Sequence, residues 1–301
     1  MIDSRRALAR LITQIENNHP SARQALAALY PNTGRARLVG VTGAPGTGKS
    51  TLVNEMAKAF RGLNQTVAII AVDPTSPFTG GAILGDRIRM RDLAGDEGVF
   101  IRSMATRGNL GGLARATADV ALALDAAGFD VILIETVGAG QAEVDIAQLA
   151  HTTLVVEAPG LGDDVQAIKA GILEIADVLV VNKADQPGAA DAVRALRGML
   201  SLAHGRTEWK VPICETVAVE GKGVDELLKA IDQHRSYLEA SGEMDQRKRA
   251  NVKRQVEMLL QEQLMARFML AQNGGNKLEE AVEAVVSLAS DPYSAVEKLL
   301  R

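Results

Sequence analysis

The feature that most constrains this chain is a glycine-rich octapeptide between an apolar run and a helix-forming run. Residues 43–50 read Gly-Ala-Pro-Gly-Thr-Gly-Lys-Ser and match the pattern G-x-x-x-x-G-K-[ST]. The apolar run before it, 38–41, predicts a strand, and residues 49–61 after it predict a helix. Such a strand–loop–helix unit, a P-loop, turns backbone N–H groups and the positive end of a helix toward an anion. The unit therefore predicts a phosphate-binding α/β domain.

Each residue type in this loop has a physical role. The glycines let the backbone curl around an anion, Lys49 is expected to reach the β- and γ-phosphates, and the Ser50 hydroxyl is expected to bind Mg²⁺. The phosphate-binding residues predicted from the motif are Gly43, Ala44, Pro45, Gly46, Thr47, Gly48, Lys49, Ser50 and Thr51. A glycine-rich turn without a ligand is the plain alternative, and the strand–loop–helix context argues against it.

The rest of the chain alternates short apolar runs with helical segments. Strands are expected at 38–41, 67–72, 99–101, 131–134, 153–156, 178–181 and 211–214, and helices between them at 49–61, 110–127, 163–175, 188–202 and 224–240. Continuous apolar strands joined by helices predict a doubly wound, mostly parallel α/β sheet. We also expect helical extensions at both ends, which divides the chain into an N-terminal arm (1–34), a P-loop domain (35–242) and a C-terminal arm (243–301).

The two arms carry their own helix signals. Residues 4–30 are expected to form one or two helices, with an interruption at His19-Pro20 and a second short helix that runs to Leu29. In the C-terminal arm we expect a long helix at about 244–271 that Asn273-Gly274-Gly275 ends, and a last short helix that Asp291-Pro292 opens.

Composition excludes several classes of protein. The single cysteine, Cys214, excludes an intrachain disulfide, and its place in an apolar run predicts a core position. A net charge of −4 and 3% aromatic residues are unlike a nucleic-acid-binding surface, so no nucleic acid is expected as a partner. No apolar run reaches the length of a membrane span and no signal-peptide pattern is present. The sequence therefore predicts a cytoplasmic protein that does not enter a membrane.

A second motif indicates which base the nucleotide carries. The apolar run 178–181 continues into Asn182-Lys183-Ala184-Asp185, the N-K-x-D pattern that reads guanine in G proteins. Asp185 is expected to accept hydrogen bonds from the guanine ring N–H and exocyclic amine, which adenine does not offer in that geometry. Asn182 is expected at the other edge of the base, with the stem of Lys183 over the ring. Together the two motifs predict GTP and GDP as the bound nucleotides.

Carboxylates occur where two of the predicted strands end. Asp73 follows the second strand, Asp86 lies in the glycine-rich loop after it, and Glu135 opens Glu135-Thr-Val-Gly138, which has the form of the D-x-x-G element that senses a γ-phosphate. With Ser50, these three are the candidate ligands of Mg²⁺ or its waters. The Gly138 N–H is expected at the γ-phosphate, and no glutamine follows it, so intrinsic hydrolysis should be slow. Helix or turn caps are the alternatives for Asp73 and Asp86.

Taken together, these motifs resemble those of one family. The stretches that carry the resemblance are 43–51, 73–77, 80–86, 104–115, 135–138, 159–169 and 182–185. They are similar to the ArgK/MeaB family, G-protein chaperones of adenosylcobalamin-dependent acyl-CoA mutases such as methylmalonyl-CoA mutase. The resemblance covers about residues 5–300. It implies a SIMIBI-class GTPase that gates cofactor loading, protects or reactivates the mutase, and forms a homodimer through its C-terminal helices.

The resemblance also implies roles for single residues. Three loops are implied as switches, at 73–89, 135–142 and 158–169. The implied switch residues are Asp73, Asp86, Arg87, Glu135, Asp163 and Lys169, of which Lys169 couples to the partner in the family. Lys49, Asp86 and Glu135 are the implied catalytic residues. For Asp163 a helix N-cap is the alternative.

Two departures from the family pattern and several alternatives accompany this interpretation. Val217 replaces the serine of a Ser-Ala pair, so only the backbone N–H of Ala218 is expected at the guanine oxygen, and Asn109 stands where histidine is common. A small-molecule kinase that uses ATP is the alternative function, but it leaves N-K-x-D unexplained. A nucleotide-dependent metal-insertion GTPase would need a His/Cys cluster, which four scattered histidines and one cysteine do not supply. The apolar stripe 252–268 fits either an internal core or a dimer seam.

Overall fold

The computed structural model describes residues 4–73, 91–93, 95–105, 112–136, 141–160, 174–202, 208–271 and 274–300. The chain divides into two compact units, Met1–Arg247 and Lys248–Arg301. The first unit holds all the described strands, and the second is helical. The predicted boundaries at 34 and 242 stay predictions.

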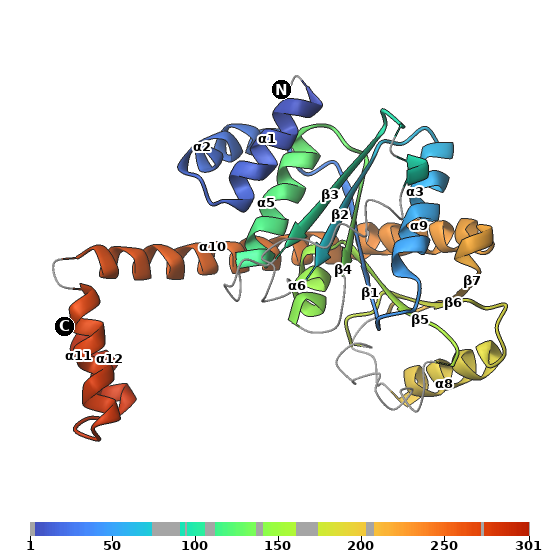
Figure 1. Cartoon of the computed structure of the whole chain (residues 1–301). Helices are drawn as coiled ribbons and strands as arrows, with labels where there is room; N and C mark the ends of the chain where they lie inside the picture. Colours follow the sequence, from blue (N-terminus) through green and yellow to red (C-terminus); the bar gives the residue numbers. More distant parts are fainter. Residues whose placement is uncertain are drawn as a thin grey trace. The chain divides into compact units, whose positions relative to one another are not determined.

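A seven-stranded sheet forms the centre of the first unit (Figure 1). Its strands are β1 (Arg37–Thr42), β2 (Val67–Asp73), β3 (Val99–Ala105), β4 (Val131–Thr136), β5 (Thr152–Glu157), β6 (Val178–Asn182) and β7 (Ile213–Thr216). They lie in the order β3-β2-β4-β1-β5-β6-β7, and each neighbouring pair is parallel. Burial on both faces explains why the strands read as continuous apolar runs. The predicted doubly wound parallel sheet is confirmed.

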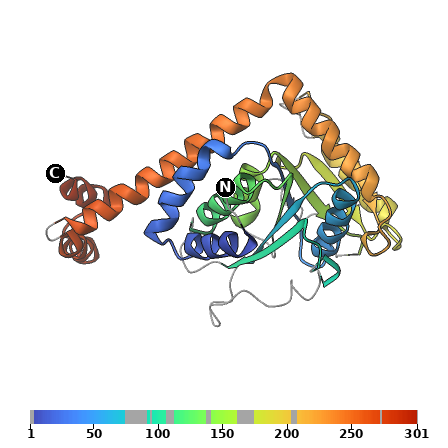
Figure 2. The ribbon, with the colours of Figure 1, turned by 90° about the horizontal axis from the view of Figure 1, so that it is seen from above.

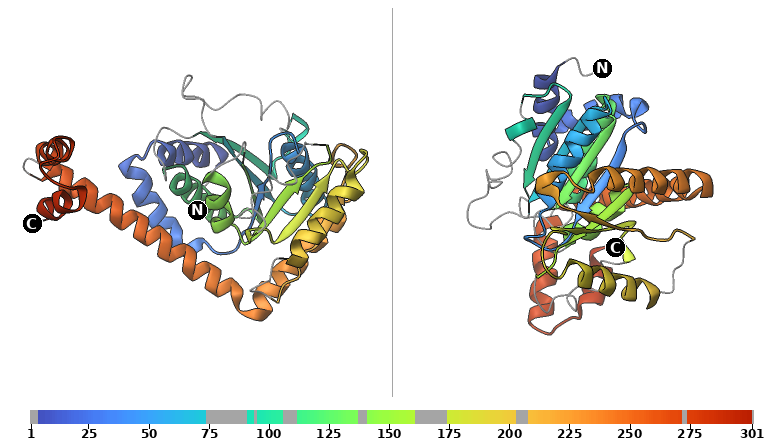
Figure 3. Two further views of the ribbon diagram at one scale, coloured as in Figure 1. Left: turned by 90° about the horizontal axis from the view of Figure 1, so that it is seen from below. Right: turned by 90° about the vertical axis from the view of Figure 1, so that its right-hand side faces the viewer.

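Helices cover both faces of the sheet, as Figures 2 and 3 show from three further directions. One face packs against α3 (Lys49–Gly62) and α9 (Val224–Ser241). The opposite face packs against α5 (Gly112–Ala126), α6 (Gln141–Leu149) and α8 (Ala189–Leu202). Because successive strand residues face opposite ways, Val39 and Val41 of β1 join the α3 core while Gly40 faces α6.

Two N-terminal helices complete the α5 side of the first unit. Helix α1 (Arg5–Glu16) buries one apolar stripe: Leu8, Leu11, Ile12 and Ile15. Helix α2 (Pro20–Leu29) begins on a proline, which fits a first turn because the N–H that it lacks has no partner inside the helix there. Glu16 of α1 forms an ion pair with Arg102 of β3. The helix pair expected before residue 30 is therefore present and is bound to the edge of the sheet.

The edge strand β7 differs from the expectation. It spans Ile213–Thr216 rather than 211–214. Pro212 has no N–H to extend the ladder, and its carbonyl oxygen accepts a hydrogen bond from Leu179 N at 2.9 Å. Cys214 consequently lies on a half-buried edge strand, packed against the core rather than inside it. Burial, with a smaller contribution from Glu226, raises the pKa of its thiol to about 11.

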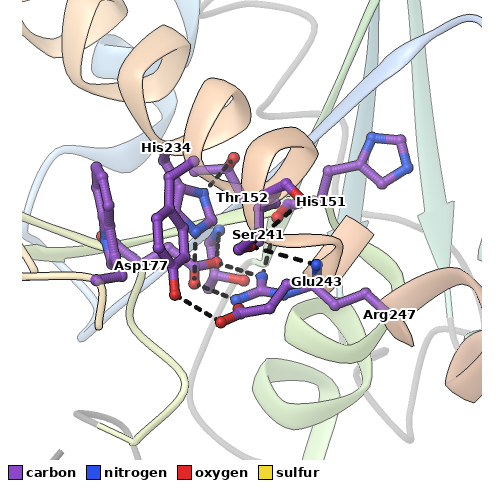
Figure 4. A network of polar contacts seen from close by, with 11 residues as sticks. His151, Thr152, Asp177, His234, Ser241, Glu243 and Arg247 are labelled. Atoms are coloured by element: carbon purple, nitrogen blue, oxygen red, sulfur yellow. Dashed lines mark hydrogen bonds and ion pairs between the residues drawn. The ribbon is translucent and has the colours of Figure 1, made fainter. Parts of the chain in front are cut away.

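A buried polar network lies at the amino edge of the sheet, where β5 and β6 begin (Figure 4). The Asp177 carboxylate accepts hydrogen bonds from Arg247 at 2.7 and 2.9 Å and from Thr153 N at 2.8 Å. His234 Nε2 lies 3.2 Å from Asp177, and His234 Nδ1 lies 2.9 Å from Thr152 Oγ1. Burial acts to raise the pKa of Asp177, but the hydrogen bonds from His234 and Arg247 outweigh it and hold this pKa below its usual value.

The second unit contains most of α10 (Glu243–Leu270), then α11 (Gly274–Val286) and α12 (Pro292–Leu299). Helices α11 and α12 pack against each other, and Asp291 caps α12 as expected by accepting hydrogen bonds from Tyr293 N and Ser294 N. The long helix ends at Leu270, close to the expected end at about 271. Of the expected capping segment Asn273-Gly274-Gly275, the two glycines belong to α11 rather than to a cap of α10, and Asn273 lies outside the described residues. Among the described helices, none is long and apolar enough to cross a membrane.

Candidate nucleotide-binding site

The P-loop connects β1 to α3 at the carboxyl edge of the sheet. The connections that leave β1 and β4 run in opposite directions across the sheet, and α/β folds bind ligands at such a switch point. Gly43, Gly46 and Gly48 have φ angles of 137°, 84° and 91°, in the region that favours glycine. A Cβ on Gly43 would lie 2.1 Å from the carbonyl oxygen of Val156 on β5. The close approach of these two backbones explains the glycine at position 43.

Lys49 is buried within this loop. Its Nζ donates hydrogen bonds to the carbonyl oxygens of Gly43 and the following residue, at 2.7 and 3.0 Å. Burial lowers the pKa of Lys49, and the negative charges of Glu135, Glu143 and Glu157 act in the opposite direction. The ammonium group therefore lies in the field of carboxylates from β4, α6 and β5.

Ser50 and Glu135 meet where the sequence predicts a metal ion. Ser50 Oγ donates a hydrogen bond to Glu135 Oε1 at 2.5 Å, and Glu135 is 1% exposed at the end of β4. Hydroxyl and carboxylate oxygens are the ligands that Mg²⁺ prefers, so this pair fits the predicted ion. The backbone of Asp73 ends β2, next to β4, while its side chain is outside the description.

Asn182 connects the base-reading motif to the phosphate loop. Its Nδ2 donates to Thr47 O at 2.8 Å, and its Oδ1 accepts from Thr216 Oγ1 and Ala218 N, both at 3.1 Å. A Cβ on Gly48 would lie 2.5 Å from Asn182 Nδ2. The amide that we expected at the edge of the base thus bonds to the loops around it. Asn182, the last residue of β6, therefore connects the P-loop to the end of β7 and to the segment that follows β7.

Lys183 and Asp185 extend the same motif toward solvent. Lys183 has a φ of 56°, and its Nζ donates to Gly46 O at 2.8 Å, so its stem runs from the end of β6 to the P-loop. Ala184 N donates to Thr216 O at 3.0 Å, which fixes this turn to β7. Asp185 is exposed, so its carboxylate is accessible to a ligand.

Several predicted residues lie outside the described part of the chain: Asp86, Arg87, Gly138, Asp163 and Lys169. Their roles stay predictions. Contacts within the structure bring together the P-loop, Glu135, Asn182, Lys183 and Ala218. Asp185 follows them in the chain and is exposed.

Two residues that the sequence did not single out belong to this site. Thr216 supplies a hydroxyl to Asn182, beside Val217, where the family pattern has a serine. Glu143 lies in the first turn of α6, eight residues after Glu135, and is buried. The signal that identifies Glu143 is a carboxylate on the apolar face of the helix that follows Glu135-Thr-Val-Gly.

Comparison with known proteins finds relatives that are named as GTPases. The family described as "Methylmalonyl Co-A mutase-associated GTPase MeaB" matches residues 8–273. A Pyrococcus abyssi protein named as a GTPase is 48% identical over 99% of this chain and 92% of its own length. GTPase ArgK of Escherichia coli is 39% identical over 80% of this chain and 76% of its own. The mitochondrial methylmalonic aciduria type A homolog of Mus musculus is 31% identical over 99% of this chain and 76% of its own length.

Solved structures show the same fold. The crystal structure of a LAO/AO transport system kinase superposes with a TM-score of 0.76 at 27% identity, covering 98% of this chain and 92% of that one. HypB from Helicobacter pylori in complex with nickel gives a TM-score of 0.51 at 16% identity, and the match covers 73% of this chain and 96% of that one. The second likeness concerns the fold alone.

Proposed function

Because this chain belongs to the MeaB family of GTPases, we propose that it is a Mg²⁺-dependent GTPase chaperone of an adenosylcobalamin-dependent acyl-CoA mutase such as methylmalonyl-CoA mutase. In this role it gates the loading of intact cofactor and protects or reactivates the mutase. The observation that carries the nucleotide part is the hydrogen bond from Asn182 to Thr47 O at 2.8 Å, which joins the guanine motif to the phosphate loop. The family description and the name of the mouse relative support the mutase as partner.

The residues of this site have different roles in GTP hydrolysis. The backbone N–H groups of the P-loop and the start of α3 bind the phosphates, and Lys49 adds a positive charge toward the β- and γ-phosphates. Ser50 and Glu135 would hold Mg²⁺, and the bound ion would neutralise charge on the phosphate oxygens. We assign Asp73 and Asp86 to the same ion and the Gly138 N–H to the γ-phosphate.

Guanine selection is tested at Asp185. Asp185→Asn replaces a double acceptor by a group with one acceptor and one donor, so GTP should lose two charge-assisted hydrogen bonds and xanthosine triphosphate should gain affinity. Two such bonds correspond to a loss of about 100-fold or more in GTP affinity. Titration with fluorescent nucleotide analogues measures this, with the exposed Asp191→Asn on α8 as control. Unchanged GTP affinity contradicts the assignment, and a preference for ATP in the unmodified protein favours the kinase alternative.

The chaperone role needs its own experiment. The purified chain is mixed with a cobalamin-dependent acyl-CoA mutase in the presence of GDP or a non-hydrolysable GTP analogue, and complex formation is measured by light scattering. We expect association that depends on the nucleotide, and stimulated GTP hydrolysis in the complex. Association with no such mutase under either condition contradicts the chaperone role and leaves the GTPase activity unaffected.

We also propose that the second unit forms a homodimer. Val252, Val256, Leu260 and Leu264 recur every four residues on α10 and are 45–57% exposed. A stripe of this kind on a helix marks an interaction surface. Leu260→Glu should convert a dimer into a 31.9 kDa monomer in size-exclusion chromatography with light scattering, whereas Lys253→Glu should not. A monomeric unmodified protein contradicts this proposal.

A further inference from the structure

Glu143 is a buried carboxylate to which no function has yet been assigned. It is 6% exposed and lies in the first turn of α6. Removing a carboxylate from water is costly unless opposite charge or hydrogen-bond donors lie close by. Elsewhere in the described chain, buried Asp125 accepts hydrogen bonds from the backbone N–H groups of residues 34–36, and buried Asp177 pairs with Arg247. The surroundings of Glu143 therefore indicate its role.

Helix α6 runs back along β1, from the carboxyl edge of the sheet to the amino edge. At its end, His151 N donates to Leu38 O at 2.9 Å, near the start of β1. Further along the strand, a Cβ on Gly40 would lie 2.9 Å from Ile146 Cγ2 and 3.1 Å from Ala150 Cβ. Each step toward the start of α6 is thus a step toward the P-loop.

This direction brings Glu143 to the end of β1. Glu143, Ile146 and Ala150 are buried and lie on one face of α6, as their spacing of three and four residues requires. The three residues from Ile146 back to Glu143 rise about 4.5 Å, and the two strand residues from Gly40 to Thr42 span about 6.6 Å. Because Ile146 lies against Gly40, Glu143 lies over the end of β1, close to Thr42, next to which the P-loop begins.

Among the described residues, Lys49 is a cation at this end of β1. Its Nζ donates to Gly43 O at 2.7 Å, directly after Thr42. The negative charge of Glu143, with those of Glu135 and Glu157, acts to raise the pKa of Lys49 against the effect of burial. Glu135 already accepts a hydrogen bond from Ser50. Glu143 is thus a second carboxylate that acts on the P-loop lysine, and it belongs to a different element.

We propose that Glu143 is a positioning residue for Lys49, holding the ammonium group at the base of the P-loop from α6. The proposal rests on the assigned role of Lys49 in phosphate binding. Glu143 then competes with the nucleotide phosphates for the lysine charge. Loss of the Glu143 charge should strengthen GDP binding. The same loss should slow cleavage of the γ-phosphate, because Lys49 is then no longer directed to the negative charge that develops on the phosphate in the transition state.

The test is the kinetics of Glu143→Gln, which keeps the size of the side chain and removes its charge. We expect GDP to bind about five- to tenfold more tightly, the effect of one partly screened charge, while single-turnover hydrolysis slows about tenfold. Glu143→Asp should restore part of the hydrolysis rate. Asp145→Asn, on the same helix but only partly buried, should change neither value. Thermal unfolding of each variant reports whether the fold is retained.

A double-mutant cycle separates this role from a structural one. In a Lys49→Met background, Glu143→Gln should no longer change GDP affinity. The inference is overturned if the effect persists in that background, or if Glu143→Gln and Glu143→Asp weaken GDP binding and hydrolysis together. If Lys49→Met itself hydrolyses GTP normally, the assigned role of the P-loop lysine fails instead. If Lys49→Met is inactive and Glu143→Gln behaves like the unmodified protein, only the role of Glu143 fails.

Discussion

Arg247→Leu removes the guanidinium group that attaches the N-terminal part of α10 to the amino edge of the sheet (Figure 4). Arg247 donates two hydrogen bonds to the Asp177 carboxylate, at 2.7 and 2.9 Å, and one to His151 O at 3.0 Å. Asp177 keeps the Thr153 N–H and His234 as partners, but it loses the one partner among the described residues that donates two hydrogen bonds to it.

The expected loss of unfolding free energy in Arg247→Leu follows from how deeply the two side chains of the ion pair are buried. Removing one partner of a fully buried ion pair costs about 3–5 kcal/mol, because the other charge is left in a poor solvent. The Arg247 side chain is 31% exposed, and the Asp177 side chain is 9% exposed and keeps two partners, so we expect a smaller loss. A loss of about 2–3 kcal/mol corresponds to a fall in Tm of about 4–12 °C for a unit of this size.

The assay uses Trp209, the single tryptophan of the chain. Its Nε1 donates to Asp177 O at 2.8 Å, and its ring centroid lies 4.9 Å from that of His234, so its fluorescence reports on this cluster. Urea unfolding followed by tryptophan fluorescence should show a lower free energy of unfolding for Arg247→Leu. Arg249→Leu, an exposed position on the same helix, should change it by less than about 0.5 kcal/mol.

The pH dependence provides an independent check. The pKa of Asp177 is below its usual value, so its contribution is fully present above the unfolded pKa of about 3.9 and is lost as the pH falls through the lower folded value. The difference between the unmodified protein and Arg247→Leu should therefore be constant near neutral pH and should shrink below about pH 4. Equal stability at pH 7, or a difference that persists undiminished to about pH 2, refutes the reasoning.

Three further predictions concern other contacts. Gly40→Val forces side-chain atoms against Ile146 and should destabilise the fold by about 1–3 kcal/mol in urea unfolding, while an unchanged stability contradicts the close approach of α6. Thr216→Val removes the hydroxyl that donates to Asn182 and should weaken GTP binding about five- to tenfold. A GTP affinity equal to that of the unmodified protein contradicts a role of this hydrogen bond in the site. Cys214, with a thiol pKa of about 11, should react slowly with a disulfide reagent at about pH 8 until the protein unfolds, and rapid reaction of the folded protein contradicts its burial.

The fold followed from the sequence to a large extent because its signals are local. The apolar runs predicted the strands, and Pro20 and Asp291 marked helix starts that the structure confirms. The failures occurred at ends of elements, as at β7 and at Gly274. There the register depends on a neighbouring strand, or the helix can begin on either side of a glycine, and neighbouring residues in the sequence do not decide between these possibilities.

The candidate site likewise has features that the sequence predicted and features that it did not. The residue types of the P-loop and of N-K-x-D were readable in the sequence, because each motif is contiguous. That Asn182 bonds to Thr47 was not readable, since 135 positions separate the two residues. The same holds for Thr216, whose hydroxyl meets Asn182 only because β6 and β7 are adjacent strands.

The sequence by itself determined the family, the parallel α/β sheet and the phosphate loop, because backbone preference, glycine placement and hydrophobic period act over a few residues. Only the tertiary structure decided which charges are buried and what lies opposite them. Glu143 and Asp177 are ordinary acidic residues in the sequence, and their environments are created by β1, α3, α9 and α10. The energy of a buried charge depends on the partners and solvent around it, and folding brings those partners from distant parts of the chain.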